Sequence, residues 1–195
     1  GFARVDVGTF GTVFAVRASG ELWSWGDNAE DVLGRMKEAR NYVGPGRATD
    51  FAGEKIRRAG GVVARDQYGT GFAITYDGRL LTWGTSKSTV AYPGPVPIAV
   101  AGFENVSSAA GITENVCAVA DGRLYCWGLS GTKACSGSAD PIMSPLQIRT
   151  RGDAPAQQVS VNSSNTCVRL TDGTIECCGS DSFGQLGTGI TDAGP

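Results

Sequence analysis

Six cysteines are the residues of this chain best suited to chemistry, and all of them lie in its second half. They are Cys117, Cys126, Cys135, Cys167, Cys177 and Cys178. A structural zinc site combines closely spaced cysteines with further cysteines or histidines, whereas this chain has no C-x₂-C pair and no histidine. The cysteines therefore form disulfides in an oxidising compartment, which we favour, or are buried as small apolar residues.

Catalytic groups are hard to find in the sequence. Histidine, the commonest general base, is absent. No nucleophile elbow, phosphate-binding loop or dinucleotide-binding glycine motif occurs either. We therefore expect no catalytic residue, no metal site and no cofactor, and a protein that is not an enzyme.

A predicted β-hairpin positions the first two cysteines. Asp121-Gly122 indicates a two-residue turn, since both central residues of a type I′ turn need a positive φ. This register places Cys117 opposite Cys126. Two sets of side chains then face opposite ways: Cys117, Val119, Leu124 and Cys126 on one side, and Ala118, Tyr125 and Trp127 on the other. Both sides are apolar, which is typical of a sheet lying between two other sheets.

The same register predicts the disulfide pairs. Cys117 and Cys126 should be bonded, because opposed strand residues are close enough for a disulfide. Cys167 should pair with Cys177 if Thr171 to Gly173 form a three-residue loop, or face Cys178 if the turn has two residues. Cys135 and Cys178 then remain, and they either pair across neighbouring units or stay free.

The hairpin occurs four times, at Phe14–Gly26, Phe72–Gly84, Cys117–Gly128 and Cys167–Gly179. In each copy a turn glycine stands six residues before the closing glycine; the turn glycines are Gly20, Gly78, Gly122 and Gly173. Trp25, Trp83 and Trp127 precede the closing glycine in three copies, and we expect all three to be buried between units. The chain is therefore a repeat protein.

Four units of about 50 residues fit the spacing, at approximately 1–53, 54–101, 102–153 and 154–195. Only 18% of the residues are charged and 29 of 195 are glycine, a composition typical of turn-rich β proteins. The net charge of −2 does not favour nucleic-acid binding. No apolar run is long enough to predict a membrane-spanning helix. We expect an all-β fold of propeller blades, forming a single propeller that is part of a longer chain.

The pattern A-[VI]-x-x-D-G-x-[LI]-x-x-W-G, followed by G-Q-L-G at the end of the chain, resembles the regulator of chromosome condensation repeat. Phe72–Gly84, Cys117–Gly128 and Cys167–Gly187 carry the resemblance, and Phe14–Gly34 does so more loosely. It implies a β-propeller, usually of seven four-stranded blades, of which about four are present. The paired cysteines resemble those of secreted members and of crinkly-type receptor kinase ectodomains.

The resemblance implies a non-enzymatic module, extracellular or on the cell surface, that binds another protein through loops on one propeller face. Guanine-nucleotide exchange on a small GTPase and a receptor kinase ectodomain are the alternatives. We expect contacts at Asn28–Asp31, Thr85–Tyr92 and Ser130–Asp140, because loops vary where the strands repeat. The open arc should also leave an apolar face at each end, so that the chain alone associates.

Three short motifs remain. Asn105-Val106-Ser107 and Asn162-Ser163-Ser164 match the N-glycosylation acceptor, within the predicted lead-in strands. Arg151-Gly152-Asp153 matches an adhesion tripeptide. We interpret that tripeptide as a solvated loop.

Overall fold

The computed structural model describes residues 1–28, 30–35, 42–51, 53–64, 68–85, 94–112, 115–128, 135–136, 142–162 and 164–189. Almost all of its regular structure is β. The elements in chain order are β1 (Phe2–Val7), η1 (Thr9–Gly11), β2 (Val13–Arg17), β3 (Leu22–Asp27), β4 (Tyr42–Arg47), β5 (Ile56–Ala64), β6 (Tyr68–Thr75), β7 (Leu80–Gly84), β8 (Gly94–Ala99), β9 (Val106–Ile112), β10 (Asn115–Ala120), β11 (Arg123–Gly128), β12 (Ile142–Ile148), β13 (Ala156–Val161), β14 (Asn165–Leu170) and β15 (Ile175–Gly179).

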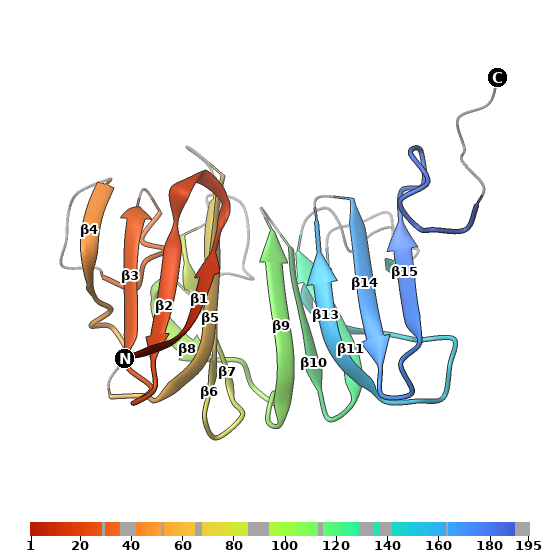
Figure 1. The fold of residues 1–195 in the computed structure, drawn as a ribbon, viewed down its shortest axis with the longest axis horizontal. Helices are drawn as coiled ribbons and strands as arrows, with labels where there is room; N and C mark the ends of the chain where they lie inside the picture. Colours follow the sequence, from red (N-terminus) through yellow and green to blue (C-terminus); the bar gives the residue numbers. More distant parts are fainter. Residues whose placement is uncertain are drawn as a thin grey trace.

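Four antiparallel sheets follow one another along the chain (Figure 1). The first three sheets have four strands each, β1–β4, β5–β8 and β9–β12, and the fourth has the three strands β13–β15. Each sheet is one blade, numbered one to four in chain order. The prediction of an all-β chain made of propeller blades is confirmed.

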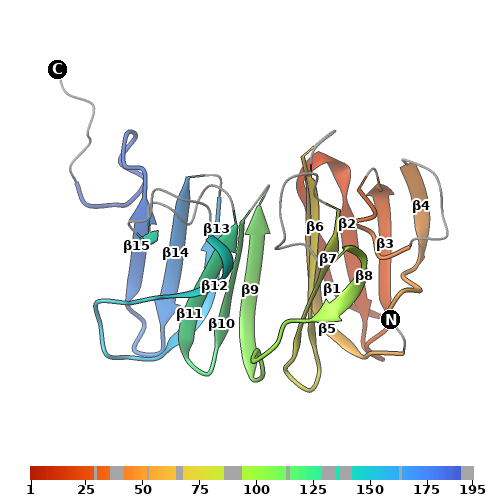
Figure 2. The same ribbon diagram turned by 180° about the vertical axis from the view of Figure 1, so that it is seen from behind.

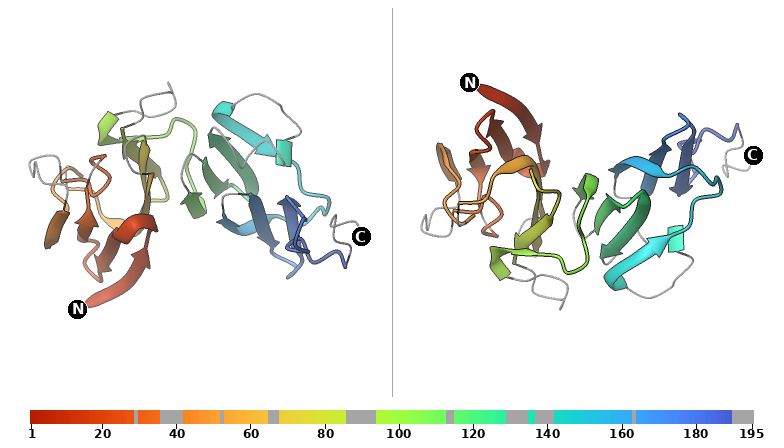
Figure 3. Two further views of the ribbon diagram at one scale, coloured as in Figure 1. Left: turned by 90° about the horizontal axis from the view of Figure 1, so that it is seen from above. Right: turned by 90° about the horizontal axis from the view of Figure 1, so that it is seen from below.

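The first strands of consecutive blades lie side by side: β1 contacts β5, β5 contacts β9, and β9 contacts β13. These strands therefore form the inner side of an arc of blades, seen from above and below in Figure 3. The last strands β4, β8 and β12 lie at the outer edges, and Figure 2 shows β8 and β12 from behind. Blade one and blade four lie at opposite ends of the arc.

Each predicted hairpin forms the middle of a blade. The third has the predicted two-residue turn, with φ of 48° at Asp121 and 72° at Gly122. The other three have three-residue loops that end in a glycine at φ of 87° to 90°; these glycines are Gly20, Gly78 and Gly173. All four turn glycines have a positive φ, the conformation that glycine adopts without steric cost.

The closing glycines are required for a different reason. Gly26, Gly84, Gly128 and Gly179 have φ between 103° and 130°. A Cβ at Gly84 would lie 1.9 Å from the carbonyl oxygen of Gly69, and one at Gly26 would lie 1.8 Å from that of Gly11. The strand opposite therefore leaves no space for a side chain, which explains why glycine ends every hairpin.

Three apolar cores lie between the blades. The first lies between blades one and two, the second between blades two and three, and the third between blades three and four. The two sides of the third hairpin belong to different cores: Cys117, Val119, Leu124 and Cys126 to the third, and Ala118 and Trp127, with Tyr125 against them, to the second. The predicted placement of a sheet between two others is thus confirmed for blade three.

Candidate protein-binding surface

One strand position in each blade connects that blade to the one before it. Trp83 of blade two is fully buried, and its rings meet Phe14 and Phe51 of blade one edge to face, with centroids 6.4 and 4.9 Å apart. Its Nε1 donates a hydrogen bond of 2.7 Å to the carbonyl oxygen of Val32 in the β3–β4 loop. Trp127 occupies the same place in blade three and is also buried. Trp83 therefore fixes blade two to the β3–β4 loop of blade one.

Trp25 is less buried than Trp83 and Trp127. It occupies the matching place in blade one, opposite Val13, as Trp83 lies opposite Gly71. No sheet of the described residues covers that side of blade one, so the Trp25 ring lacks the cover that blade one gives to Trp83. The three tryptophans therefore share one place in successive blades and differ in the extent of their burial.

The structure contains three disulfides, and they include all six cysteines. Cys117–Cys126 and Cys167–Cys177 each join opposed residues of one hairpin, with Cα atoms 4.1 Å apart. Thr171 to Gly173 form a three-residue loop, closed by the hydrogen bond from the Leu170 N–H to the Thr174 carbonyl. That loop places Cys177, rather than Cys178, opposite Cys167.

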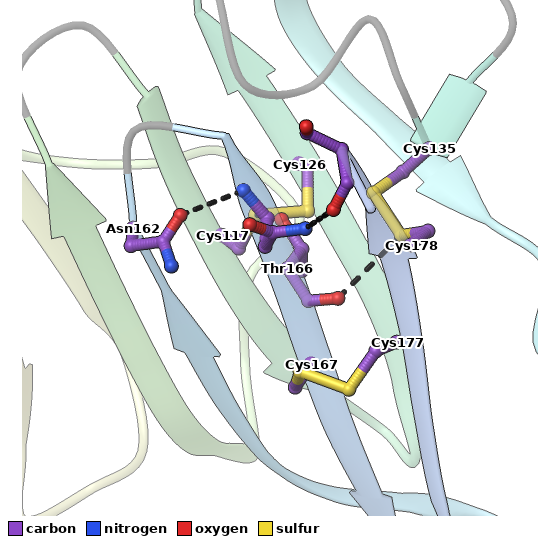
Figure 4. Close-up of a disulfide and its surroundings, with 10 residues drawn as sticks. Cys117, Cys126, Cys135, Asn162, Thr166, Cys167, Cys177 and Cys178 are labelled. Carbon is purple, nitrogen blue, oxygen red and sulfur yellow. Dashed lines mark hydrogen bonds between the residues drawn. A yellow bond between two sulfur atoms is a disulfide. The ribbon is translucent and has the colours of Figure 1, made fainter. Parts of the chain in front are cut away.

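The third disulfide joins two blades. Cys178 takes the place of the tryptophan in blade four and bonds to Cys135, in the β11–β12 connection of blade three (Figure 4). Its partner stands seven residues after the closing glycine Gly128, as Leu33 does after Gly26. A covalent bond therefore links the same two positions that Trp83 and the Val32–Leu33 segment connect by packing.

The three predicted contact loops all follow the third strand of a blade. The ends of the strands β3, β7 and β11, after which these loops begin, share one face of the arc, here called the long-loop face, opposite the hairpin turns. Of these loops, the structure describes residues 28, 30 and 31, Thr85, and residues 135 and 136. The other parts of Thr85–Tyr92 and Ser130–Asp140 lie outside the described residues.

Two carboxylates, Glu30 and Asp31, lie in the described part of the β3–β4 loop, on the long-loop face where blade one meets blade two. Asp31 has a φ of 55°, and its pKa is raised by partial burial and by the negative charges of Glu30 and Asp50. The Thr85 hydroxyl of blade two donates to a Glu30 carboxylate oxygen at 2.7 Å, which joins the two blades. This arrangement gives the loop a fixed shape and a negative potential. Sequence alone did not indicate it, because Asp50 is distant along the chain.

The turn aspartates on the opposite face have local partners. Hydrogen bonds from Thr75 and Arg79 lower the pKa of Asp77, and the Thr174 N–H lowers that of Asp172. Asp121 accepts a bond from the Asn105 amide at 2.9 Å. These contacts support turn chemistry for the three aspartates. In the described part of the chain, no group of three or more carboxylate or cysteine side chains is arranged to hold a metal ion.

Two cavities lie where blades meet. One, of about 290 Å³, lies on the inner side of the arc between β1, β5 and β9, where Arg58 and Asp6 form an ion pair of 3.5 Å. Burial lowers the pKa of Arg58. The other, of about 260 Å³, lies between blades three and four, beside Cys135, Cys177 and Cys178. Neither cavity contains a predicted site residue apart from these cysteines.

The acceptor asparagines Asn105 and Asn162 are exposed, as are Arg151, Gly152 and Asp153. Val106 and Ser107 lie in strand β9, as predicted, whereas Asn105 directly precedes that strand and Asn162 directly follows β13. The Arg151 and Gly152 N–H groups donate to the Glu176 carboxylate at 2.7 and 2.8 Å. This contact fixes the backbone of a surface loop and supports the structural interpretation of the tripeptide.

Comparison with known proteins agrees with the architecture. A family model described as the regulator of chromosome condensation (RCC1) repeat matches residues 156–185. The ultraviolet-B receptor UVR8 of Arabidopsis thaliana is 29% identical over 185 residues, which are 90% of this chain and 40% of that protein.

Two solved structures share the fold. Prp20p of Saccharomyces cerevisiae has a TM-score of 0.74 and 19% identity, over 100% of this chain and 48% of that one. The ectodomain of the Arabidopsis thaliana receptor kinase ACR4 has a TM-score of 0.54 and 13% identity, over 92% and 53%. The chain therefore spans about half the length of the proteins it matches. Among its described residues, no helix is long and apolar enough to cross a membrane.

Proposed function

The chain is a protein of regulator of chromosome condensation repeats, and on that premise we propose that it is a non-enzymatic module that binds another protein. The long-loop face of the blades is the binding surface. A rigid scaffold that presents irregular loops at one end is the usual arrangement for recognition. The observation that carries the proposal is the pair of carboxylates Glu30 and Asp31 on this face, of which Glu30 is held by the Thr85 hydroxyl.

The electrostatics of this group indicate the chemistry of the partner. The negative charges of Glu30 and Asp50 disfavour ionisation of Asp31, so a positive charge that approaches Asp31 would be stabilised. A partner with lysine or arginine at its contact surface would relieve this repulsion. The Glu30 contact with Thr85 holds the loop against blade two, so little loop entropy is lost on binding.

The disulfides support an oxidising location, outside the cell or on its surface. All six cysteines are paired, and such pairing persists in secreted and extracellular proteins. An ectodomain of a receptor kinase is among the proteins with this fold. In this proposal the chain acts as a secreted or surface-attached module. A receptor ectodomain is one form of the same proposal, in which the module belongs to a protein with a membrane-anchored part.

Guanine-nucleotide exchange is the alternative from another class. Prp20p, which shares the fold, is described as binding Gsp1p and histones. The paired cysteines favour the extracellular module over this alternative, because disulfides are rare in nuclear and cytosolic proteins.

The test is capture of partners from surface and secreted extracts of the source cells, by the oxidised chain and by two charge-matched variants. Glu30→Lys with Asp31→Lys reverses the proposed site. Glu104→Lys with Asp153→Lys makes the same charge change at exposed residues on the hairpin-turn face. We expect a partner that is retained by the control and lost by the site variant.

Equal capture by both variants would exclude the long-loop face as the binding surface. Accelerated nucleotide release from a small GTPase by the wild-type chain would favour the exchange alternative. Six alkylatable thiols in the native protein would remove the argument for an oxidising compartment.

A further inference from the structure

The joint between blades three and four lacks the aromatic rings that fill the first two joints. Trp83 stands opposite Gly71 in blade two and directly precedes the closing glycine. Cys178 stands opposite Thr166 in blade four and also directly precedes the closing glycine, so it occupies the tryptophan position. Both Trp83 and Trp127 are buried at this position. Because a cysteine side chain is much smaller than an indole, the third joint loses most of the volume that tryptophan supplies.

A second ring is replaced at the same joint. Phe51 lies five residues before the start of β5, and its ring meets that of Trp83 edge to face, with centroids 4.9 Å apart. A phenylalanine makes the same kind of contact with the tryptophan of the second joint. Arg151 lies five residues before the start of β13, so it takes the place of the phenylalanine at the third joint. Both rings of the usual aromatic pair are therefore absent between blades three and four.

A cavity of about 260 Å³ lies at this joint. Its apolar wall consists of core side chains and of cysteines from two disulfides (Figure 4), namely Leu124, Ile148, Val168, Cys135, Cys177 and Cys178. Among the described residues, the core between blades one and two contains no side chain of β8, and only Ile142 of β12 packs against the core between blades two and three. The fourth strand of a blade thus adds little to the joint with the blade before it, and the space comes mainly from the replaced rings.

Charged side chains line the same cavity. Arg149 and Arg151 are exposed, and neither guanidinium group has a hydrogen-bond or ion-pair partner among the described residues. Glu176 is already engaged, because its carboxylate accepts hydrogen bonds from the Arg151 and Gly152 N–H groups at 2.7 and 2.8 Å. Two positive side chains and one negative side chain leave a net charge of +1 around the cavity. The cavity therefore favours an anion.

We propose that this cavity binds a small aromatic carboxylate, independently of any protein partner. An apolar cavity with a few polar groups at its edge is the usual form of a small-molecule site. The ring of the ligand occupies the place that tryptophan and phenylalanine fill at the other joints, against apolar side chains and sulfur atoms. Its carboxylate accepts hydrogen bonds from the guanidinium groups of Arg149 and Arg151, whose planar geometry suits a carboxylate.

The experiment measures binding of 2-naphthoate to the oxidised chain by isothermal titration calorimetry, with the uncharged 2-naphthamide in parallel. Arg149→Ala with Arg151→Ala removes both cations, so it should weaken binding of the carboxylate at least ~10-fold and leave the weaker binding of the amide unchanged. Arg123→Ala is the control, because Arg123 is also exposed but does not line the cavity. The control should keep the wild-type affinity for both compounds.

A second variant tests the location of the site. Arg151→Phe restores the ring found at the first two joints, so it should weaken binding of both the carboxylate and the amide at least ~10-fold. The replaced side chains are exposed and the Arg151 N–H bond to Glu176 is kept, so the fold is retained, which a thermal melt checks. No saturable binding of 2-naphthoate by the wild-type chain, an equal loss in Arg123→Ala, or undiminished binding by Arg151→Phe would overturn the proposal.

Discussion

Cys178 is bonded to Cys135 between blades three and four. The two cysteines occupy the positions that correspond to Trp83 and the Val32–Leu33 segment, which pack together between blades one and two. One contact is a covalent bond and the other is side-chain packing with a hydrogen bond, and each connects a blade to the loop of the blade before it. A covalent bond to the preceding loop compensates for packing that a cysteine side chain is too small to supply.

The disulfide between blades and the disulfides within single hairpins should differ in their effect on the free energy of unfolding. Cys135–Cys178 spans 43 residues and Cys167–Cys177 spans 10. The chain-entropy model gives about 4 and about 2.7 kcal/mol for loops of these lengths. We therefore expect the double variant Cys135→Ala, Cys178→Ala to lose more unfolding free energy than Cys167→Ala, Cys177→Ala, as measured by urea denaturation. An equal or smaller loss would show that the inter-blade bond is not a structural link.

The disulfides should also differ in their accessibility to reductant. Cys117 and Cys126 are 1% and 0% exposed, whereas Cys135 and Cys178 are partly exposed beside a cavity. Under a limiting concentration of dithiol, the inter-blade bond should be reduced before the bond within blade three. Timed alkylation followed by peptide mapping measures the order. Earlier reduction of Cys117–Cys126 would contradict the burial seen here.

Replacing the buried tryptophan should be costly. Trp83→Ala leaves a large cavity between blades one and two and an unpaired Val32 carbonyl, for a loss of about 3–5 kcal/mol. Trp25→Ala is the matched control, because it occupies the same place on a blade without a predecessor; it should lose less than about 1.5 kcal/mol in dilute protein. Equal losses would mean that Trp25 is buried in solution.

The closing glycines should tolerate no side chain. Gly84→Ala combines a φ of 125° with a clash against the Gly69 carbonyl, so we expect a loss of more than about 2 kcal/mol. Gly44→Ala, on strand β4, has nothing within 4 Å of the added Cβ and should change stability by less than about 0.5 kcal/mol. Thermal melts of the two variants make the comparison.

Two aspartates should give opposite dependence on pH. The folded pKa of Asp31 is raised by burial, so its contribution to stability is present at low pH and lost as the pH rises through that value. Asp31→Asn should therefore raise the melting temperature at neutral pH and have no effect well below pH 3.8.

Asp77 is the opposing case. Hydrogen bonds from Thr75 and Arg79 lower its folded pKa, so its contribution is present at neutral pH and lost as the pH falls. Asp77→Asn should lower the melting temperature at neutral pH and have little effect in acid. The same sign for both variants would contradict the assigned causes.

The sequence by itself determined everything that depends on neighbours along the chain. The spacing of Gly20, Gly78, Gly122 and Gly173 specified four hairpins, because a turn of two or three residues fixes which residues are opposed. That register also specified the Cys117–Cys126 pair and the alternation of apolar sides. Repetition of the register was enough to predict the blades and to suggest the family.

Only the tertiary structure decided how one blade meets the next. The pairing of Cys135 with Cys178, the hydrogen bond from Trp83 to Val32 and the grouping of Glu30 with Asp50 all join residues whose separation carries no local signal. The extent of burial of Trp25 was also decided at this level: its sequence context matches that of Trp83, but the described sheets cover only the latter. Burial is a property of the surrounding sheets, so identical local patterns can have different environments.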